Sequence, residues 1–401
     1  MTKMTSKRLK DKKVPNLRFP GFEGEWETKK LGEIGEIVNG LTYSPNDIDE
    51  NGVLVLRSSN VQNRSLAFQD NVYVRTDNYN PVQENDILIC VRNGSKNLIG
   101  KNALINKKNE GVAFGAFMSI YRSSFNRFLF HWFDTNEYKE IVHKNLGATI
   151  NSINGSDLKN FKVPFPSVKE QKKIASFLSL VDERIQTQNK IIEELETLKT
   201  SISKKIFSRE LRFKNNNGSK FPEWINKRFR EIATIIMGQS PESTSYNIEG
   251  IGLPLIQGNA DIVNRLSAPR QYTKNPTKQC DIGDILLTVR APVGYVSKSS
   301  HNACIGRGIC SVKNNKHSSN EFIYQFLLYF ENKWKSLEQG STFTSVNSSD
   351  IGSIIIKVPC IEEQKKIADF LHGIDSKIST EKILLQKLEE QKKYLLDNLF
   401  V

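Results

Sequence analysis

Along two stretches of the chain, apolar residues recur with the spacing of a heptad repeat, while the residues between them are mostly polar or charged. The first set is Leu178, Val181, Ile185, Ile192, Leu195 and Ile202, and the second, 193 residues further on, is Leu371, Ile374, Ile378, Leu385, Leu388 and Leu395. This pattern predicts two long helices, each with one apolar face.

The beginning of each helix is written twice. The hexapeptide Glu-Gln-Lys-Lys-Ile-Ala starts at Glu170 and again at Glu363, and both copies continue into Phe-Leu after one intervening residue. The same offset holds without a gap between residues 147–185 and 340–378, where seventeen of 39 positions are identical. A match of this length indicates an internal duplication.

Two matching apolar faces in one chain predict that the helices pack on each other, as an antiparallel coiled coil. The alternative is that each face docks on its own globular domain. One antiparallel register, in which polar pairs would help to fix the alignment, places opposite one another Ile192 and Leu388, Leu195 and Leu385, Ile185 and Leu395, Ile202 and Ile378, Lys199 and Glu381, and Gln188 and Lys392.

Short β-rich runs also occur in pairs. Residues 85–92 and 283–290 each read as a turn, a buried strand and a terminal arginine, Arg92 or Arg290, at an offset of 198 residues. The run 53–56 has its counterpart in 255–256, and helical stretches are expected at 127–144 and 321–337. Trp26 and Trp224 open the two halves and are expected in the core.

Length and charge limit the function. The 401 residues suffice for two or three domains, and 38% hydrophobic with 25% charged residues is typical of globular proteins. The net charge of +13 suggests a polyanionic partner, most simply nucleic acid. The alternative is a basic surface without such a partner.

The cysteines and the N-terminal residues predict the cellular setting. Five cysteines without metal-ligand spacing favour a reduced, cytoplasmic protein. Residues 1–14 are expected to form a disordered basic arm; the first 13 lack the apolar segment of a signal peptide. No apolar run approaches the length of a membrane span.

Catalytic motifs are hard to find in this sequence. The stretch from Gly94 to Lys101 has one residue too many for a phosphate-binding loop, and Asn102 follows where Ser or Thr is required. Asp86 and Asp284 precede strands, where a turn-forming role is more plausible than a nuclease site. Two rival hypotheses remain: a stand-alone nuclease or methyltransferase, and a coiled-coil adaptor without a DNA role, which would show no salt-sensitive DNA binding.

Candidate DNA-contacting residues lie at matching places in both halves. Arginine suits guanine and phosphate, Asn and Gln suit adenine, and small hydroxyl-bearing loops suit phosphate. The set is Arg57, Ser58, Asn60, Arg92, Asn93, Ser95, Thr149 and Asn151 in the first half, and Gln257, Asn259, Arg290, Tyr295, Thr342 and Thr344 in the second.

Three features together resemble the specificity subunits of type I restriction-modification enzymes: the Glu-Gln-Lys-Lys-Ile-Ala-x-Phe-Leu helix starts, the Gly-Asp-Ile-Leu-type strands, and the Gly-x-Thr…Asn…Asp-Leu/Ile approach to a proline. The resemblance covers nearly the whole chain. It implies an α+β fold with two similar target-recognition domains of mixed strands and short helices, at 15–166 and 213–359. The two long helices, 167–212 and 360–401, would then form the antiparallel coiled coil between them.

The resemblance also implies a function. Each domain would read one half of a bipartite double-stranded DNA site, and the chain would be a non-catalytic scaffold for two methyltransferase subunits and for restriction subunits. S-adenosylmethionine, ATP and Mg²⁺ would bind to those partners, and this chain would hold no cofactor or metal. Departures are local: Asn85 stands where the second copy has Gly283, and Cys360 where the first has Ser167.

Helix length predicts how far apart the half-sites lie. About 35 helical residues at roughly 1.5 Å each span on the order of 50 Å. That distance fits two major-groove sites about one to one and a half DNA turns apart, at ~34 Å per turn. The helices are therefore expected to set the unspecified spacer.

Overall fold

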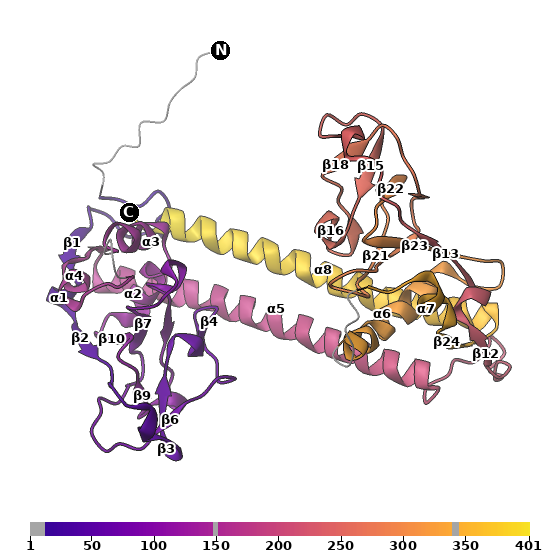
Figure 1. Cartoon of the computed structure of the whole chain (residues 1–401). Helices are drawn as coiled ribbons and strands as arrows, with labels where there is room; N and C mark the ends of the chain where they lie inside the picture. The colour runs from indigo at the N-terminus through magenta and orange to yellow at the C-terminus, as the bar shows by residue number, and fades with distance from the viewer. Residues whose placement is uncertain (1–12, 147–150, 339–344) are drawn as a thin grey trace. The chain divides into compact units, whose positions relative to one another are not determined.

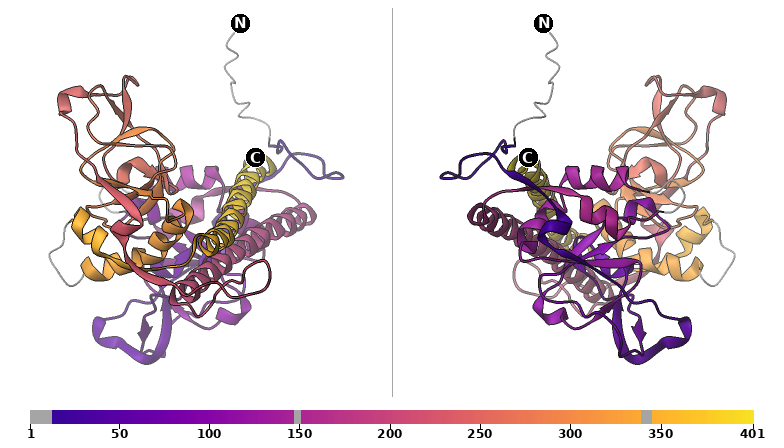
Figure 2. Two further views of the ribbon diagram at one scale, coloured as in Figure 1. Left: turned by 90° about the vertical axis from the view of Figure 1, so that its right-hand side faces the viewer. Right: turned by 90° about the vertical axis from the view of Figure 1, so that its left-hand side faces the viewer.

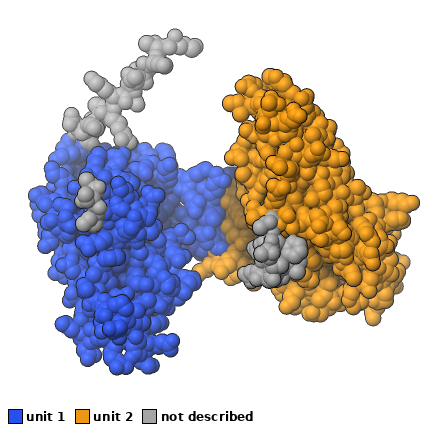
Figure 3. All heavy atoms as spheres, in the orientation of Figure 1, with its two compact units in different colours: residues 1–189, 384–401 blue, residues 190–383 orange. Residues whose placement is uncertain are grey.

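The computed structural model of the chain describes residues 13–146, 151–338 and 345–401. The chain divides into two compact units, residues 1–189 with 384–401 (unit 1) and residues 190–383 (unit 2), shown in Figure 3. Each unit contains mixed strands and helices together with part of both long helices, so the predicted α+β class is confirmed.

A four-stranded antiparallel sheet lies at the centre of unit 1 (Figure 1). Its order is β2 (Glu36–Asn39), β10 (Met118–Arg122), β7 (Ile87–Cys90) and β8 (Asn102–Leu104). Successive side chains of β7 point to opposite faces: Ile87 and Ile89 join the core under the helices, while Leu88 and Cys90 join a second core under the outer strands. Burial on both faces explains why this strand is an unbroken apolar run.

Smaller elements complete unit 1. The outer strands are β3 (Ile48–Leu56), β6 (Tyr73–Val74) and β9 (Ala113–Phe114), with the hairpin β4 (Val61–Gln62) and β5 (Ser65–Leu66) beside them. The other elements of the domain are β1 (Glu27–Lys30), which pairs with β11 (Lys162–Phe165), and the helices α1 (Leu31–Ile34), α2 (Asn126–Trp132), α3 (Asn136–Lys144) and α4 (Gly155–Asn160).

Unit 2 repeats this plan with more extended strand pairing. One sheet has the order β13 (Ala233–Met237), β23 (Ile309–Asn314), β20 (Ile285–Thr288), β21 (Val296–Lys298), β17 (Leu266–Ser267) and β16 (Ile262–Val263). The other has the order β14 (Tyr246–Asn247), β18 (Gln271–Thr273), β15 (Leu253–Ile256), β22 (Ala303–Ile305) and β19 (Gln279–Cys280). Here β12 (Ile225–Arg228) pairs with β24 (Ile355–Val358), and the helices are α6 (Asn320–Glu338) and α7 (Ser348–Ser353).

The helix predicted over 127–144 is interrupted, and that prediction is wrong at the interruption. The first segment ends at Trp132, and Thr135 caps the second, because its Oγ1 accepts the Tyr138 backbone N–H at 3.2 Å. The preceding Asp134 is held by an ion pair with Lys392 at 2.7 Å. In unit 2 the corresponding stretch is the continuous helix α6.

The aspartate before each central strand has the turn-forming role that the sequence predicts. Asp86 accepts the backbone N–H of Gln83, and Asp284 accepts that of Asp281, both at 2.8 Å. Both carboxylates also bind a residue of the neighbouring strand: Arg122 reaches Asp86 at 2.7 Å, and Ser311 reaches Asp284 at 2.9 Å. These contacts fix the beginnings of β7 and β20.

The long helices are α5 (Val168–Ser208) and α8 (Ile361–Leu399). In unit 1, the first part of α5 shares a core with the last part of α8, through Leu178 and Leu395. In unit 2, the last part of α5 shares a core with the first part of α8, through Ile206 and Leu371. Each apolar face thus meets both the other helix and a globular domain, so the two alternatives drawn from the sequence both hold in part.

The polar pairs between the helices differ from the predicted register. Lys199 bonds with Asp375 at 2.6 Å in unit 2, rather than with Glu381. In unit 1, Lys392 contacts Asp182 at 2.7 Å, rather than Gln188. The two ion pairs join corresponding residues of the duplication, which aligning apolar positions alone does not reveal.

Each long helix begins with a buried glutamate that an upstream arginine binds. Arg18 donates to both Glu170 oxygens at 2.8 and 2.9 Å, and Arg212 reaches Glu363 at 3.0 Å. In unit 1 the Ser167 hydroxyl accepts the Glu170 N–H at 3.4 Å, which is one half of a capping box. The Glu170 carboxylate does not supply the other half of the box, because both of its oxygens accept from Arg18.

The end of α8 lies beside the N-terminal segment of unit 1, as Figure 2 shows. The Leu17 N–H donates to the Asn398 carbonyl at 2.8 Å, and the Phe400 ring stacks on Phe128 with centroids 5.4 Å apart. Trp26 is 2% exposed, and its ring contacts that of Phe400. The last residues of the chain therefore complete the core of its first domain, and the prediction that Trp26 belongs to this core is confirmed.

His131 of unit 1 is a buried histidine whose pKa is strongly lowered. It is 1% exposed, its Nε2 lies 3.3 Å from the Ser179 hydroxyl, and its Nδ1 lies 3.6 Å from Asp182. Burial, with the nearby charges of Arg64 and Lys392, lowers the pKa of His131 to about 3. In unit 2 a glutamine stands at the corresponding place, and Gln325 donates to Asp375 at 2.9 Å.

We predict that His131→Gln makes unit 1 more resistant to acid. The folded chain keeps His131 neutral while the unfolded chain protonates it near pH 6.5, so its contribution to stability falls as pH drops from about 6.5 towards 3. At pH 5 the protonation of His131 in the unfolded chain lowers the free energy of unfolding by about 2 kcal/mol relative to neutral pH. Denaturant unfolding at pH 7.5 and pH 5 measures it, with the exposed His317→Gln as the control. An equal acid-induced loss in His131→Gln and in the unmodified chain would contradict the prediction.

Candidate nucleic-acid interface

The arginines predicted at the ends of the central strands occupy corresponding positions in the two units. Arg92 follows β7 and forms an isolated backbone bridge with Ser152, and Arg290 follows β20 and forms one with Ser345. Both are exposed. Within the described ranges, neither guanidinium has an ion pair with an acidic residue. Each unit therefore presents one uncompensated positive charge at the same place.

Four further predicted residues gather around Arg92 in unit 1. The Asn93 side chain donates to the Ser58 hydroxyl at 3.0 Å, and its oxygen accepts the Ser95 N–H at 3.0 Å. The Asn151 amide donates to the Gly94 carbonyl at 2.9 Å. These bonds bring three loops into one polar surface that contains both donors and acceptors, which is what base edges and phosphates require.

Two residues of unit 1 that were predicted to contact DNA make contacts within the protein. Asn60 is completely buried: its oxygen accepts the Arg57 N–H at 2.9 Å, and its amide donates to the Ala67 carbonyl at 2.9 Å. Arg57 forms an ion pair with Asp70 at 2.9 Å. The structure thus gives Asn60 a structural role that the sequence did not predict, and its side chain is not accessible to DNA in this conformation.

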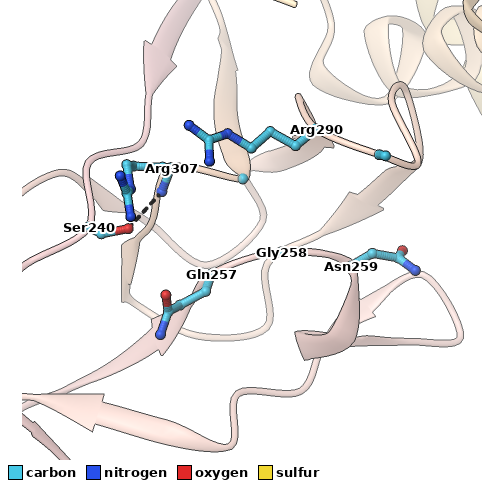
Figure 4. A pocket seen from close by; sticks show the side chains of 8 residues that line it. Ser240, Gln257, Gly258, Asn259, Arg290 and Arg307 are labelled. Atoms are coloured by element: carbon cyan, nitrogen blue, oxygen red, sulfur yellow. Dashed lines mark hydrogen bonds between the residues drawn. The ribbon is translucent and has the colours of Figure 1, made fainter. Parts of the chain in front are cut away.

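In unit 2 the predicted residues meet at a surface pocket of about 200 Å³ (Figure 4). Gln257 lies at the end of β15, Asn259 in the turn that follows, and Arg290 after β20. Figure 4 shows the Arg290 side chain extending towards Arg307, which the sequence analysis missed. The lining residues are Ser240, Gln257, Gly258, Asn259, Arg290, Ala291, Arg307 and Gly308.

The remaining predicted residues do not line this pocket in the described structure. Tyr295 is half-buried, and the Arg265 guanidinium lies 4.8 Å from its ring centroid. Arg265 in turn binds Glu331 of α6 through two bonds of 2.6 and 2.9 Å. Tyr295 therefore supports an internal contact. Thr149, Thr342 and Thr344 lie outside the described residues.

Sequence reasoning also missed Phe117. Its ring is 56% exposed and lies under the Arg92 guanidinium, 5.8 Å from centroid to carbon. An exposed aromatic ring beside an unpaired arginine is suited to contact nucleic-acid bases. The sequence alone offered no signal for it, because the match between Gly115 and Gly306 is revealed by their backbone hydrogen bonds to Leu56 and Ile256.

Close backbone contact explains a second pair of glycines, Gly40 and Gly238, which face Gly115 and Gly306. A Cβ on Gly40 would lie 2.2 Å from the Gly115 carbonyl oxygen, and one on Gly238 would lie 2.2 Å from that of Gly306. Both units therefore bring the same two segments together where only glycine fits. This contact places the turns after Gly115 and Gly306 at the polar surfaces described above.

The cysteine of unit 1, Cys90, is completely buried. Burial raises the pKa of Cys90 to about 11, so the thiol remains protonated at neutral pH. In the described part of the chain, no group of three or more His, Cys, Asp or Glu side chains is placed to hold a metal ion. The same part contains no helix with the length and apolar character needed to cross a bilayer.

Two corresponding polar surfaces on a duplicated fold, each with an exposed arginine, are suited to a DNA-recognition protein with two reading domains. Comparison with known proteins gives the family: the type I restriction modification DNA specificity domain matches residues 23–197 and 222–390. The chain belongs to this family.

One relative and one solved structure match nearly the whole chain, and a second relative matches part of it. The protein named as the MjaX specificity subunit of a type I restriction enzyme, from Methanocaldococcus jannaschii, is 34% identical over 395 residues, covering 93% of this chain and 92% of its own. The Escherichia coli EcoKI specificity subunit is 23% identical over 58% of this chain and 53% of its own. The crystal structure of an S subunit from M. genitalium shares the fold, with a TM-score of 0.63 at 19% identity over 97% and 99% of the two chains.

We predict that Asn60→Ala destabilises unit 1 by about 1–3 kcal/mol, because it leaves buried backbone groups without their partner. Ser95→Ala, at an exposed position, is the matched control and should change stability by less than about 0.5 kcal/mol. Thermal or denaturant unfolding measures both. Equal stabilities of the two variants would show that Asn60 does not have the structural role assigned to it.

Proposed function

We propose that this chain reads a bipartite double-stranded DNA site, with one half-site bound by each unit. The observation that carries the proposal is the repeated placement of an exposed arginine, Arg92 or Arg290, that has no acidic partner among the described residues and lies on a polar surface whose other residues differ between the units. A shared frame with different surface residues is what two different half-sites require.

We further propose that the chain is not catalytic. Two methyltransferase subunits and the restriction subunits would bind to it, and S-adenosylmethionine, ATP and Mg²⁺ would bind to those partners. The membership of the specificity family and the name of the relative from M. jannaschii support this proposal. Work on chromosomal DNA, together with five free cysteines, favours the cytoplasm as the place of action.

Mapping of adenine methylation tests the function directly. When the chain is co-expressed with its methyltransferase subunits, we expect one motif composed of two short half-sites around a fixed gap. The methyltransferase subunits without this chain are the control and should methylate no such motif. Absence of methylation, or a motif with one half-site, would contradict the proposal that both units read DNA.

Helix length provides a second prediction. Inserting seven residues into both α5, after Asn189, and α8, after Ile383, preserves the heptad phase and adds roughly 10 Å of helix. The gap in the methylated motif should then lengthen by about three base pairs at ~3.4 Å each. Insertion into one helix only is the control, because it leaves the two helices unequal in length, so that both ends can no longer pack together, and it should abolish methylation. An unchanged gap in the double insertion would refute the spacing role.

A further inference from the structure

The duplication provides an internal comparison of the two reading surfaces. The DNA backbone has the same chemistry at both half-sites, whereas the bases differ. Residues that bind phosphates can therefore be identical in the two units, while residues that read bases are expected to differ. Separating the two classes requires that corresponding positions be identified from the structure.

Backbone hydrogen bonds identify those positions. Gly115 N–H donates to the Leu56 carbonyl at 2.9 Å, and Gly306 N–H donates to the Ile256 carbonyl at 2.8 Å. Two residues later along each turn, the Phe117 carbonyl accepts from Val91 at 3.0 Å, and the Gly308 carbonyl accepts from Val289 at 2.9 Å. One residue lies between these anchors in each unit, Ala116 in unit 1 and Arg307 in unit 2.

The arginines therefore fall into two classes. Arg92 and Arg290 follow the corresponding strands and are identical in both units, whereas Arg307 has alanine as its counterpart. Building on the proposed function, we propose that Arg307 reads a guanine in the half-site of unit 2. Arg92 and Arg290 bind phosphates. Unit 1 has no arginine at the position of Arg307 and presents the exposed Phe117 ring nearby.

The turn that carries Arg307 is firmly held. The Ser240 hydroxyl accepts the Arg307 N–H at 3.1 Å (Figure 4). The Gly308 N–H donates to the Gln257 carbonyl at 3.1 Å. A Cβ on Gly308 would lie 2.3 Å from that carbonyl oxygen, so the backbones are in contact. A rigid backbone reduces the entropy that the side chain loses on binding.

The chemistry of Arg307 fits guanine. Its side chain is exposed and has no ion pair with the described acidic residues, so its donors are available. The guanidinium presents two parallel N–H groups that match O6 and N7 of guanine in the major groove. Gln257 and Asn259 line the same pocket and supply amide groups for neighbouring bases.

The test uses the purified complex of the full chain with its methyltransferase subunits and a duplex library in which both half-sites are randomised. Arg307→Ala should abolish the preference for G·C at one base pair of one half-site, a loss of roughly 10- to 100-fold in discrimination. Arg307→Lys keeps the charge without the two-pronged geometry and should lose the same preference. Arg92→Ala and Arg290→Ala should weaken binding to all sequences and lower the salt dependence by about one ion each.

The outcomes separate the inference from the function on which it rests. If the unmodified complex selects no bipartite site, the proposed function fails. If the unmodified complex selects a bipartite site, but Arg307→Ala weakens binding to all sequences equally or leaves binding unchanged, Arg307 does not read a base. Arg230→Ala, an exposed arginine of unit 2 outside the pocket, is the control for loss of charge and should leave the selected motif unchanged. A changed base preference in Arg290→Ala would overturn its assignment to phosphate.

Discussion

The structure depends on the burial of both long helices inside the domain cores. In unit 2 the central strand residue Ile285, the α5 residue Ile206 and the α8 residue Leu371 belong to one apolar cluster. In unit 1 the equivalent cluster joins Ile87, Leu178 and Leu395. The helices are therefore components of each fold, and the strands that carry the reading surfaces pack on the same core.

Charge pairing divides the arginines according to their role. Arg18, Arg212 and Arg265 bind carboxylates and hold segments of the fold together. Arg92, Arg290 and Arg307 remain at the surface without such partners among the described residues. A positive charge without a local counter-charge attracts phosphate, and an arginine already bound to a carboxylate has few donors left for another ligand. The contrast explains why net charge alone could suggest a DNA partner without showing where DNA binds.

Much of the fold could be predicted, because its strongest signals are periodic and occur twice. The heptads from Leu178 to Ile202 and the apolar strand before Arg92 follow from which side chains must be buried. The break before Thr135 could not be predicted, since it depends on a side-chain cap and on an ion pair with Lys392, far away in sequence. The partners of Lys199 and Lys392 were missed for the same reason.

The candidate surface was harder to predict than the fold. Arg92 and Arg290 could be found because they end matching strands. Asn60 has the same chemistry as a base-reading asparagine, and only its burial reveals the structural role. Arg307 and Phe117 lie in short turns whose alignment requires the backbone hydrogen bonds.

The composition of the two units has a consequence for synthesis on the ribosome. Unit 2 is continuous in sequence, from residue 190 to 383, whereas unit 1 includes residues 384–401. The ring of Phe400 and the Lys392 ammonium group contact Phe128 and Asp134 of unit 1, and both residues are made only after the whole of unit 2. The domain that is made first therefore cannot complete its core until residues 384–401 have been made, and the domain made second is the first whose residues are all available.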